Sequence, residues 1–176
     1  MSGRSERRLR RLIVSLLYGT GIRRSELIGL NIASADFSRR VLKVLGKGDK
    51  MREIPLTASL CEEISLYLSA AAWMLGSGKA SSPLLRTLAG NRLYPVYGDR
   101  AVKRELGSEV TGQKSPHILR HTLATELLNK GTDLNSIKEL LGHSSLAATQ
   151  VYTHNSIERL RTEYNKAHPR ANKSED

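Results

Sequence analysis

The chain has almost no cysteine, and this excludes two kinds of site. Among its 176 residues, Cys61 is the only cysteine. A single thiol forms no internal disulfide and supplies no cysteine cluster for a metal ion. Cys61 lies in a helical pattern, where a small, buried, apolar role is typical of a free cysteine. We therefore expect neither a disulfide framework nor a cysteine-based metal site.

Long apolar stretches are also missing from the chain. No part of it approaches the roughly 18 consecutive apolar residues that a membrane-spanning helix needs, and no signal-peptide pattern opens it. We therefore expect a soluble, cytoplasmic protein that has no membrane partner.

Acidic residues are few compared with basic ones. The chain has 28 Lys and Arg against 17 Asp and Glu, which gives a net charge of +11 and a pI near 10.1. Such a surplus favours a polyanionic partner, most simply nucleic acid. The length and the 39% hydrophobic content are typical of one globular core. We expect a single domain over residues 1–168 and a disordered tail over residues 169–176.

The first half of the chain predicts two helices followed by a small sheet. Residues 7–18 carry apolar side chains on one helical face and arginines on the other. Residues 19–21 break this helix, and residues 23–30 predict a short second one. The spacing of apolar residues then shortens to the two-residue period of β-strands, over residues 35–37, 41–45 and 52–55. A turn with two glycines joins the last two strands, so we expect an antiparallel pairing.

The second half of the chain predicts helices throughout. Ser59 and Glu62 form a capping-box pattern that opens a helix running towards Trp73, whose ring we expect in the core or at its edge. Serine, proline, aspartate and glycine signals then bound further helices at residues 95–106, 115–131, 133–141, 145–151 and 155–167. The expected fold class is mainly α with a small three-stranded antiparallel β-sheet.

His117 and Arg120 form the first candidate group of functional residues. They lie three residues apart at the start of a predicted helix, so they share one face. A helix N-terminus carries partial positive charge and is a natural seat for a phosphate group. The alternative is a solvated helix start that carries this pair by chance, because short motifs have many false positives.

Arg23, Glu26 and Lys47 form a second candidate group, upstream of the first. Arg23 stands where the chain changes direction, and Glu26 could orient it through a charge-assisted hydrogen bond. Lys47 is expected at the tip of the hairpin between the last two strands. Each residue also has a plain interpretation. Arg23 and Lys47 would be surface charges, and Glu26 would be a solubilising carboxylate.

Tyr152 is the candidate nucleophile. A phenol has a pKa of about 10, so it attacks poorly unless a base takes its proton or positive charge stabilises the phenolate. His117, Arg120 and His143 could supply these functions. Taken singly, Tyr152 could be an amphipathic core residue and His143 a group that caps a helix end. Two arginines, a lysine, two histidines and a tyrosine in this order on a basic chain nevertheless favour chemistry on a phosphodiester.

These residues resemble the catalytic domain of the tyrosine site-specific recombinases, the phage-integrase family, and most closely its Xer-type members. The spacings from Arg120 and from His143 to Tyr152 agree with the family. Four stretches carry the resemblance, namely residues 16–27 (LLYGTGIRRSEL), 46–50 (GKGDK), 115–125 (SPHILRHTLAT) and 141–154 (LGHSSLAATQVYTH).

The resemblance implies a role for each candidate residue. Tyr152 would be the nucleophile that forms a 3′-phosphotyrosyl link to DNA, and Arg23 and Arg120 would clamp the scissile phosphate. His117 and His143 would assist proton transfer and charge stabilisation. Lys47 would be the general acid. Glu26 would support Arg23, and the reaction would need no cofactor, no metal ion and no ATP.

The resemblance also implies partners for the chain. Double-stranded DNA would be the substrate, which would associate the protein with the nucleoid. Copies of the chain would assemble on DNA, up to a tetramer, with a contact through the predicted helix 155–167. We expect the separate N-terminal domain of the family to be absent, which would leave half of the clamp around DNA.

Two other classes of function remain open from the sequence. An accessory or regulatory module could keep this fold and basic surface without turning over. A type IB topoisomerase-like enzyme would use the same tyrosine chemistry but would reseal the original strand. The complete set of candidate residues argues against the first alternative, whereas the second differs in outcome rather than in active site.

Overall fold

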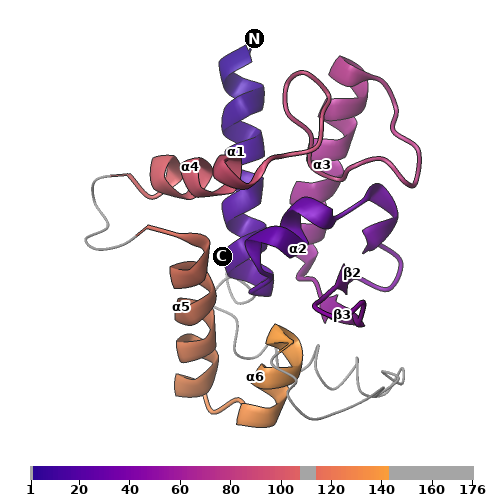
Figure 1. The fold of residues 1–176 in the computed structure, drawn as a ribbon. Coiled ribbons are helices and arrows are strands. Elements are labelled where there is room, and N and C mark those ends of the chain that lie inside the picture. The colour runs from indigo at the N-terminus through magenta and orange to yellow at the C-terminus, as the bar shows by residue number, and fades with distance from the viewer. Residues whose placement is uncertain (1, 108–113, 143–176) are drawn as a thin grey trace, which may run out of the picture.

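The computed structural model describes residues 2–107 and 114–142, and the helices expected at 145–151 and 155–167 lie outside the described residues. Within the described ranges the predicted fold class is confirmed, with helices around a small antiparallel sheet (Figure 1). In chain order the elements are α1 (Ser2–Thr20), α2 (Arg24–Gly29), η1 (Ile32–Ser34), β1 (Ala35–Asp36), β2 (Val41–Leu45), β3 (Met51–Pro55), α3 (Ala58–Leu75), α4 (Pro95–Glu105), α5 (Pro116–Asn129) and α6 (Leu134–Leu141).

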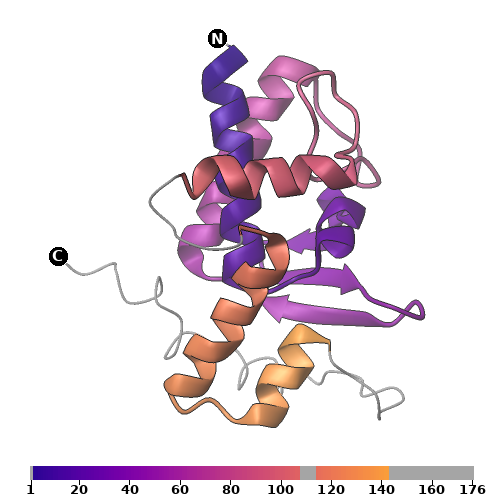
Figure 2. The ribbon, with the colours of Figure 1, turned by 60° about the vertical axis from the view of Figure 1, so that its left-hand side comes forward.

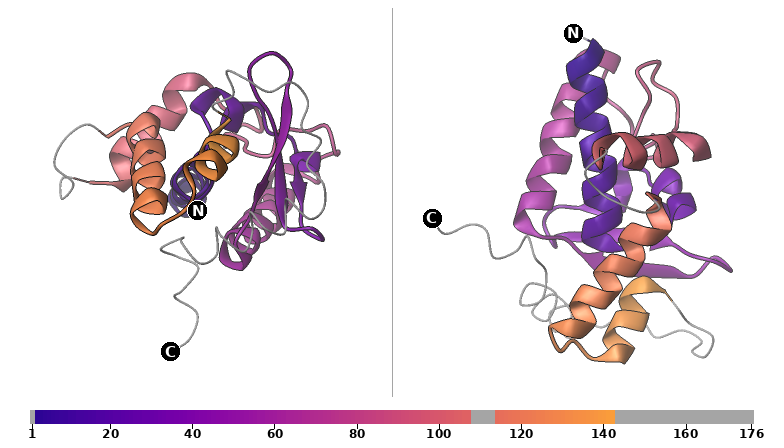
Figure 3. Two further views of the ribbon diagram at one scale, coloured as in Figure 1. Left: turned by 90° about the horizontal axis from the view of Figure 1, so that it is seen from below. Right: turned by 90° about the vertical axis from the view of Figure 1, so that its left-hand side faces the viewer.

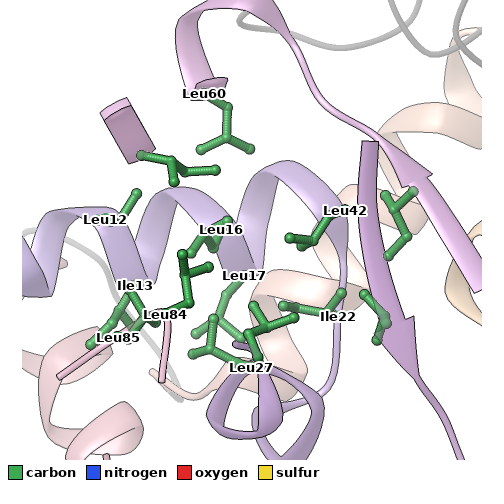
Figure 4. Packing of buried hydrophobic residues seen from close by; sticks show 14 of the residues in the cluster. Leu12, Ile13, Leu16, Leu17, Ile22, Leu27, Leu42, Leu60, Leu84 and Leu85 are labelled. Atoms are coloured by element: carbon green, nitrogen blue, oxygen red, sulfur yellow. The ribbon is translucent and has the colours of Figure 1, made fainter. Parts of the chain in front are cut away.

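The core is built around α1, which contacts α3, α4 and α5 (Figure 1). Apolar side chains of α1 recur every three or four residues, and that spacing lines them up on one face. Figure 4 shows Leu16 and Leu17 of this face meeting Leu27 of α2 and Leu42 of β2, all of them buried. The end of α1 is thereby fixed against both α2 and the sheet.

Helix α1 extends further than the sequence predicts. It begins at Ser2 and ends at Thr20, within the expected break over residues 19–21. The Thr20 hydroxyl donates to the Leu16 carbonyl oxygen at 2.6 Å in this last turn. The chain turns at Gly21, where φ is +65°. This left-handed value is one that glycine adopts at little cost. None of the helices in the described ranges is both long enough and apolar enough to cross a membrane.

The three strands pair in the order β1-β2-β3, and both pairings are antiparallel. In β2 and β3, Leu42 lies opposite Ile54 and Val44 lies opposite Arg52. The β2–β3 turn closes with a hydrogen bond from the Gly46 amide to the Lys50 carbonyl at 2.8 Å, and it projects from the body as a hairpin (Figure 2). The positive φ values fall at Gly48 and Asp49. Gly46, the other glycine of this turn, is not among the residues with positive φ.

Two helix starts and one helix end follow the sequence signals, and a third helix start differs from the prediction. Ser115 caps α5 by accepting from the Ile118 amide, and Asp133 caps α6. Helix α6 ends at Gly142, whose φ of +67° is the left-handed C-cap conformation. Helix α3 is capped by Thr57, which accepts from the Leu60 amide at 3.2 Å. The expected cap at Ser59 is wrong by two residues.

The expectation for Trp73 is also wrong, because 78% of its surface is exposed. Helix α3 buries the face that carries Leu60, Ile64, Tyr67 and Ala71. Trp73 follows Ala71 by two residues, and two helical steps place a side chain on nearly the opposite face. An aromatic side chain near a helix end thus gave no information on which face the helix buries. Cys61 is half-buried and packs against the core, close to its expected role.

Candidate active site

Three arginines from three elements converge at the end of α1. Arg23 is the N-cap of α2, Arg52 lies in β3, and Arg120 lies in the second turn of α5. Seen from below, α6 lies between α5 and the hairpin, under the end of α1 (Figure 3). Arg52, Arg23 and Arg120 each donate to a backbone carbonyl at the end of α6, those of Leu140, Gly142 and Leu141 respectively. The three cations therefore share one small region around the start of α2 and the end of α6.

Glu26 is the acidic residue at the centre of this cluster, and its side chain is 4% exposed. Its Oε2 accepts from the Arg23 amide at 2.7 Å and its Oε1 accepts from Arg23 Nη1 at 3.1 Å. Arg52 makes a bidentate ion pair with the same carboxylate, with Nη1 donating to Oε1 at 2.8 Å and Nη2 donating to Oε2 at 2.9 Å. Burial raises the pKa of the Glu26 carboxyl, but the hydrogen bonds and charges of Arg52 and Arg23 outweigh it and lower the pKa overall.

The orienting contact between Glu26 and Arg23 is present in the structure. Glu26 is buried, so the alternative of a solubilising surface carboxylate is wrong for this residue. An ionised carboxylate accepts hydrogen bonds on both oxygens, and charged donors make these bonds short and strong. Glu26 therefore restricts both the backbone and the guanidinium of Arg23 at the start of α2.

Arg120 faces the cluster from α5, and it is buried, with 7% of its surface exposed. Its Nη1 donates to the Gly21 carbonyl oxygen and its Nη2 donates to the Leu141 carbonyl oxygen, each at 2.5 Å. Desolvation, followed by the nearby charge of Arg23, lowers the pKa of Arg120 to about 10. The guanidinium remains protonated at neutral pH. A neighbouring anion would raise this pKa again, because opposite charge favours the protonated form.

The cluster carries more positive than negative charge. Arg23, Arg52 and Arg120 bring three guanidinium groups, and the carboxylate among their partners in the described ranges is that of Glu26. Buried charges are normally compensated, because an unpaired ion in a low-dielectric site is costly. An anion that reached the cluster would therefore be strongly favoured. Arg23 is the member that meets solvent, since 33% of its side chain is exposed.

No group of three or more histidine, cysteine, aspartate or glutamate side chains placed to hold a metal ion is found in residues 2–107 and 114–142. The positive charge described at this site is carried by guanidinium groups, which are planar and have several N–H donors. Such groups match the oxygens of a phosphate group particularly well.

The other predicted site residues lie at different places. His117 is exposed at the second position of α5, one turn before Arg120. Lys47 is exposed in the β2–β3 hairpin turn, as predicted. His143 and Tyr152 lie outside the described residues. The structure thus brings Arg23, Glu26 and Arg120 together. The hairpin turn with Lys47 starts beside them, since a Cβ at Gly46 would lie 3.6 Å from Glu26 Oε1.

Arg52 is the residue of this cluster that the sequence prediction missed. It was assigned only to a strand. A usable signal exists, because side chains alternate along a strand and Arg52 shares a face with the buried Ile54. An arginine on an inward face needs a buried acidic partner. Glu26 is that partner, but it lies 26 residues away in the sequence and nothing local connects the two.

Gly21 is expected to be intolerant of a side chain. A Cβ there would lie 2.4 Å from Leu141 Cδ2 and 3.0 Å from Leu123 Cδ2, and φ is +65°. Overpacking of a core costs about 1–3 kcal/mol, so Gly21→Ala should lower the free energy of unfolding by at least this amount. Urea unfolding followed by circular dichroism measures it. Gly29→Ala is the control, because no atom lies within 4 Å of a Cβ there. Equal stabilities for the two variants would contradict the packing described at the end of α1.

Comparison with solved structures identifies the fold as that of a tyrosine recombinase catalytic domain. The crystal structure of XerA recombinase is 32% identical with a TM-score of 0.68, and the match covers 97% of this chain and 65% of that one. XerH recombinase bound to its difH substrate in a pre-cleavage complex is 28% identical with a TM-score of 0.68, over 92% of this chain and 46% of that one.

Sequence comparison gives the family. The model of the phage integrase family matches residues 4–159, and the chain belongs to this family. Tyrosine recombinase XerC of Mycobacterium sp. (strain KMS) is 46% identical over 163 residues, which are 92% of this chain and 54% of that protein. XerC of Chlorobaculum tepidum is 44% identical over 92% of this chain and 49% of the relative. The chain therefore spans about half the length of these relatives.

Proposed function

We propose that the protein is a site-specific DNA recombinase that cleaves and rejoins DNA through a 3′-phosphotyrosyl intermediate. The observation that carries the proposal is the buried cluster of Arg23, Glu26 and Arg120, in which positive charge exceeds negative charge. A phosphodiester has a negative charge and two nonbridging oxygens, which can accept the paired N–H donors of a guanidinium group. The family membership and the XerH complex with DNA support the same substrate class.

The two arginines of the proposal act on the nonbridging oxygens of the scissile phosphate. Charge gathers on these oxygens when a fifth oxygen approaches phosphorus, so donors already held in place stabilise the transition state. Arg120 is held by two backbone carbonyl groups, and Arg23 is held by Glu26. Little reorganisation is then needed when the reaction occurs. His117 and His143 are proposed to assist proton transfer beside them.

The nucleophile and the general acid of the proposal are Tyr152 and Lys47. The Tyr152 hydroxyl gives its proton to a base, His117 or His143, and its oxygen attacks phosphorus. The bond from phosphorus to the 5′ oxygen then breaks, and the leaving oxygen takes a proton from Lys47. A free alkoxide is strongly basic, so a proton supplied at departure lowers the barrier. Lys47 is exposed in the hairpin turn, and this exposure supports a role in contact with bound DNA. The new phosphodiester keeps the energy of the old one, and a 5′-hydroxyl can reverse the step without ATP.

Exchange between two duplexes requires four cleavages, so the proposal includes assembly of up to four copies on double-stranded DNA. The segment 155–167, predicted to be helical, is the proposed contact between copies. Binding to DNA would place the protein at the nucleoid. The net charge of +11 supports a large electrostatic share of DNA affinity, which weakens as salt increases.

The test is covalent capture. The protein is incubated with a nicked suicide duplex, in which the short fragment carrying the 5′-hydroxyl diffuses away and religation is prevented. We expect a protein–DNA adduct on a denaturing gel that carries label from the strand 5′ of the break and none from the released fragment. The absence of an adduct on every duplex derived from Xer-type sites would favour a DNA-binding module. An adduct with relaxation of supercoiled DNA but no two-site product would favour topoisomerase-like activity.

A further inference from the structure

Arg52 joins three elements around the proposed active site, yet its side chain is only 7% exposed and does not face solvent. Its Nη1 and Nη2 fork onto Glu26 in α2 at 2.8 and 2.9 Å, and its Nε donates to the Leu140 carbonyl oxygen of α6 at 3.1 Å. The residue itself belongs to β3, the strand that follows the hairpin turn with Lys47. One side chain therefore fixes the sheet, α2 and α6 relative to one another.

Glu26 is shared unequally between two arginines. Its Oε1 accepts from Arg52 Nη1 at 2.8 Å and from Arg23 Nη1 at 3.1 Å, and only Arg52 also reaches Oε2 through its guanidinium. Arg52 is thus the main counter-ion of the buried carboxylate. The Arg23 guanidinium makes the longer of the two contacts with Glu26 Oε1. It therefore keeps further N–H donors for another anion.

We propose that Arg52 is a positioning residue of this site, which neutralises Glu26 and anchors the end of α6 so that Arg23 can face the phosphodiester. This inference rests on the proposed function. Without Arg52, the Glu26 carboxylate would take the whole of Arg23 as its counter-ion. The excess positive charge of the cluster would fall by one, and the donors of Arg23 would turn inward.

The end of α6 depends on the same guanidinium. A Cβ at Gly142 would lie 3.0 Å from both Cζ and Nη1 of Arg52, so the Arg52 side chain fills the space beside this glycine. Arg23 Nη2 donates to the Gly142 carbonyl oxygen at 3.4 Å. Gly142 directly precedes His143, one of the proposed catalytic residues, in the sequence. Arg52 therefore contacts the chain at Gly142, directly before His143 in the sequence, and Arg23 donates to the carbonyl group of the same glycine.

Arg39, in the turn between β1 and β2, offers a matched control. It makes an equivalent bidentate pair with Glu53, at 2.8 and 2.9 Å, but its side chain is 39% exposed. Its partners Glu53 and Asp36 belong to β3 and β1. Such exposed pairs contribute little to stability. Arg39→Met therefore removes a bidentate arginine without touching the proposed site.

The experiment measures adduct formation on the suicide duplex as a function of DNA concentration for the wild type, Arg52→Lys, Arg52→Met and Arg39→Met. Rates are divided by the folded fraction from thermal unfolding. Displacement of reacting groups by about 1 Å can cost on the order of 100-fold, and we expect this loss in the maximal rate for Arg52→Met. Arg52→Lys keeps the charge but not the bidentate pair, so its maximal rate should lie between those of Arg52→Met and the wild type. The DNA concentration for half-maximal rate should stay within about threefold, since most phosphate contacts are made elsewhere.

The outcomes separate this inference from the proposed function. If the wild type forms no adduct, the result contradicts the proposed function itself, and with it the inference that rests on that function. If the wild type is active and both Arg52 variants match Arg39→Met per folded molecule, Arg52 has only a structural role and the inference is overturned. The inference is also overturned if Arg52→Lys, which retains charge and most of the volume, loses its rate only in proportion to its folded fraction.

Discussion

Tyr152→Phe should abolish the covalent protein–DNA adduct completely while leaving DNA binding unchanged. The substitution removes the phenol oxygen, the proposed nucleophile, and keeps the ring and most of its volume. A phenyl ring has no atom that can attack phosphorus, so the loss is one of mechanism rather than of affinity. A denaturing gel detects the adduct, and a mobility-shift titration at fixed salt measures binding.

Tyr164→Phe is the matched control for this experiment, because it removes a second phenol from the same end of the chain. We expect this variant to form the adduct at the wild-type rate. An adduct that persists in Tyr152→Phe and disappears in Tyr164→Phe would move the nucleophile and contradict the assignment made from the spacing to Arg120 and His143.

Arg120→Met should lower the rate of adduct formation at saturating DNA on the order of 1,000-fold, since removal of one preorganised donor from a transition-state charge costs about that much. The expected effect is large because Arg120 is buried, charged and held by the Gly21 and Leu141 carbonyl groups. Methionine keeps an unbranched side chain of similar length. Single-turnover kinetics on the suicide duplex measure the rate.

Arg10→Met is the corresponding control, since Arg10 pairs with Glu6 and Glu105 between α1 and α4 and not with the cluster. Its rate per folded molecule should match the wild type. A loss of less than tenfold in Arg120→Met would mean that the guanidinium does not meet developing charge, and that its buried position serves only to join α5 to α6.

Local signals explain what the sequence predicted correctly. Ser115, Asp133 and Gly142 act within one helical turn of themselves, so the bounds of α5 and α6 were readable from the chain. The hairpin around Lys47 is equally local. The first candidate pair also lay within one turn, and the orienting contact from Glu26 to Arg23 spans only three residues.

Tertiary contacts explain what the sequence did not predict. The face that α3 buries depends on its packing against α1, so Trp73 was placed wrongly. Thr57 competes with Ser59 for the same helix start, and the backbone before α3 decides between them. The partnership of Arg52 with Glu26 arises only when the sheet folds onto α2. The balance of charge at the site therefore became visible only in three dimensions.

The most direct test of the central claim is to map the covalent linkage. The adduct formed on the suicide duplex is digested with nuclease and trypsin, and the nucleotide-bearing peptide is sequenced by mass spectrometry. Trypsin cleavage after Lys138 and Arg159 places Tyr152 in the peptide of residues 139–159, while Tyr164 falls in the peptide of residues 162–166. We predict a 3′-linked nucleotide on Tyr152. A nucleotide on peptide 162–166, or on any residue other than Tyr152, would contradict the account.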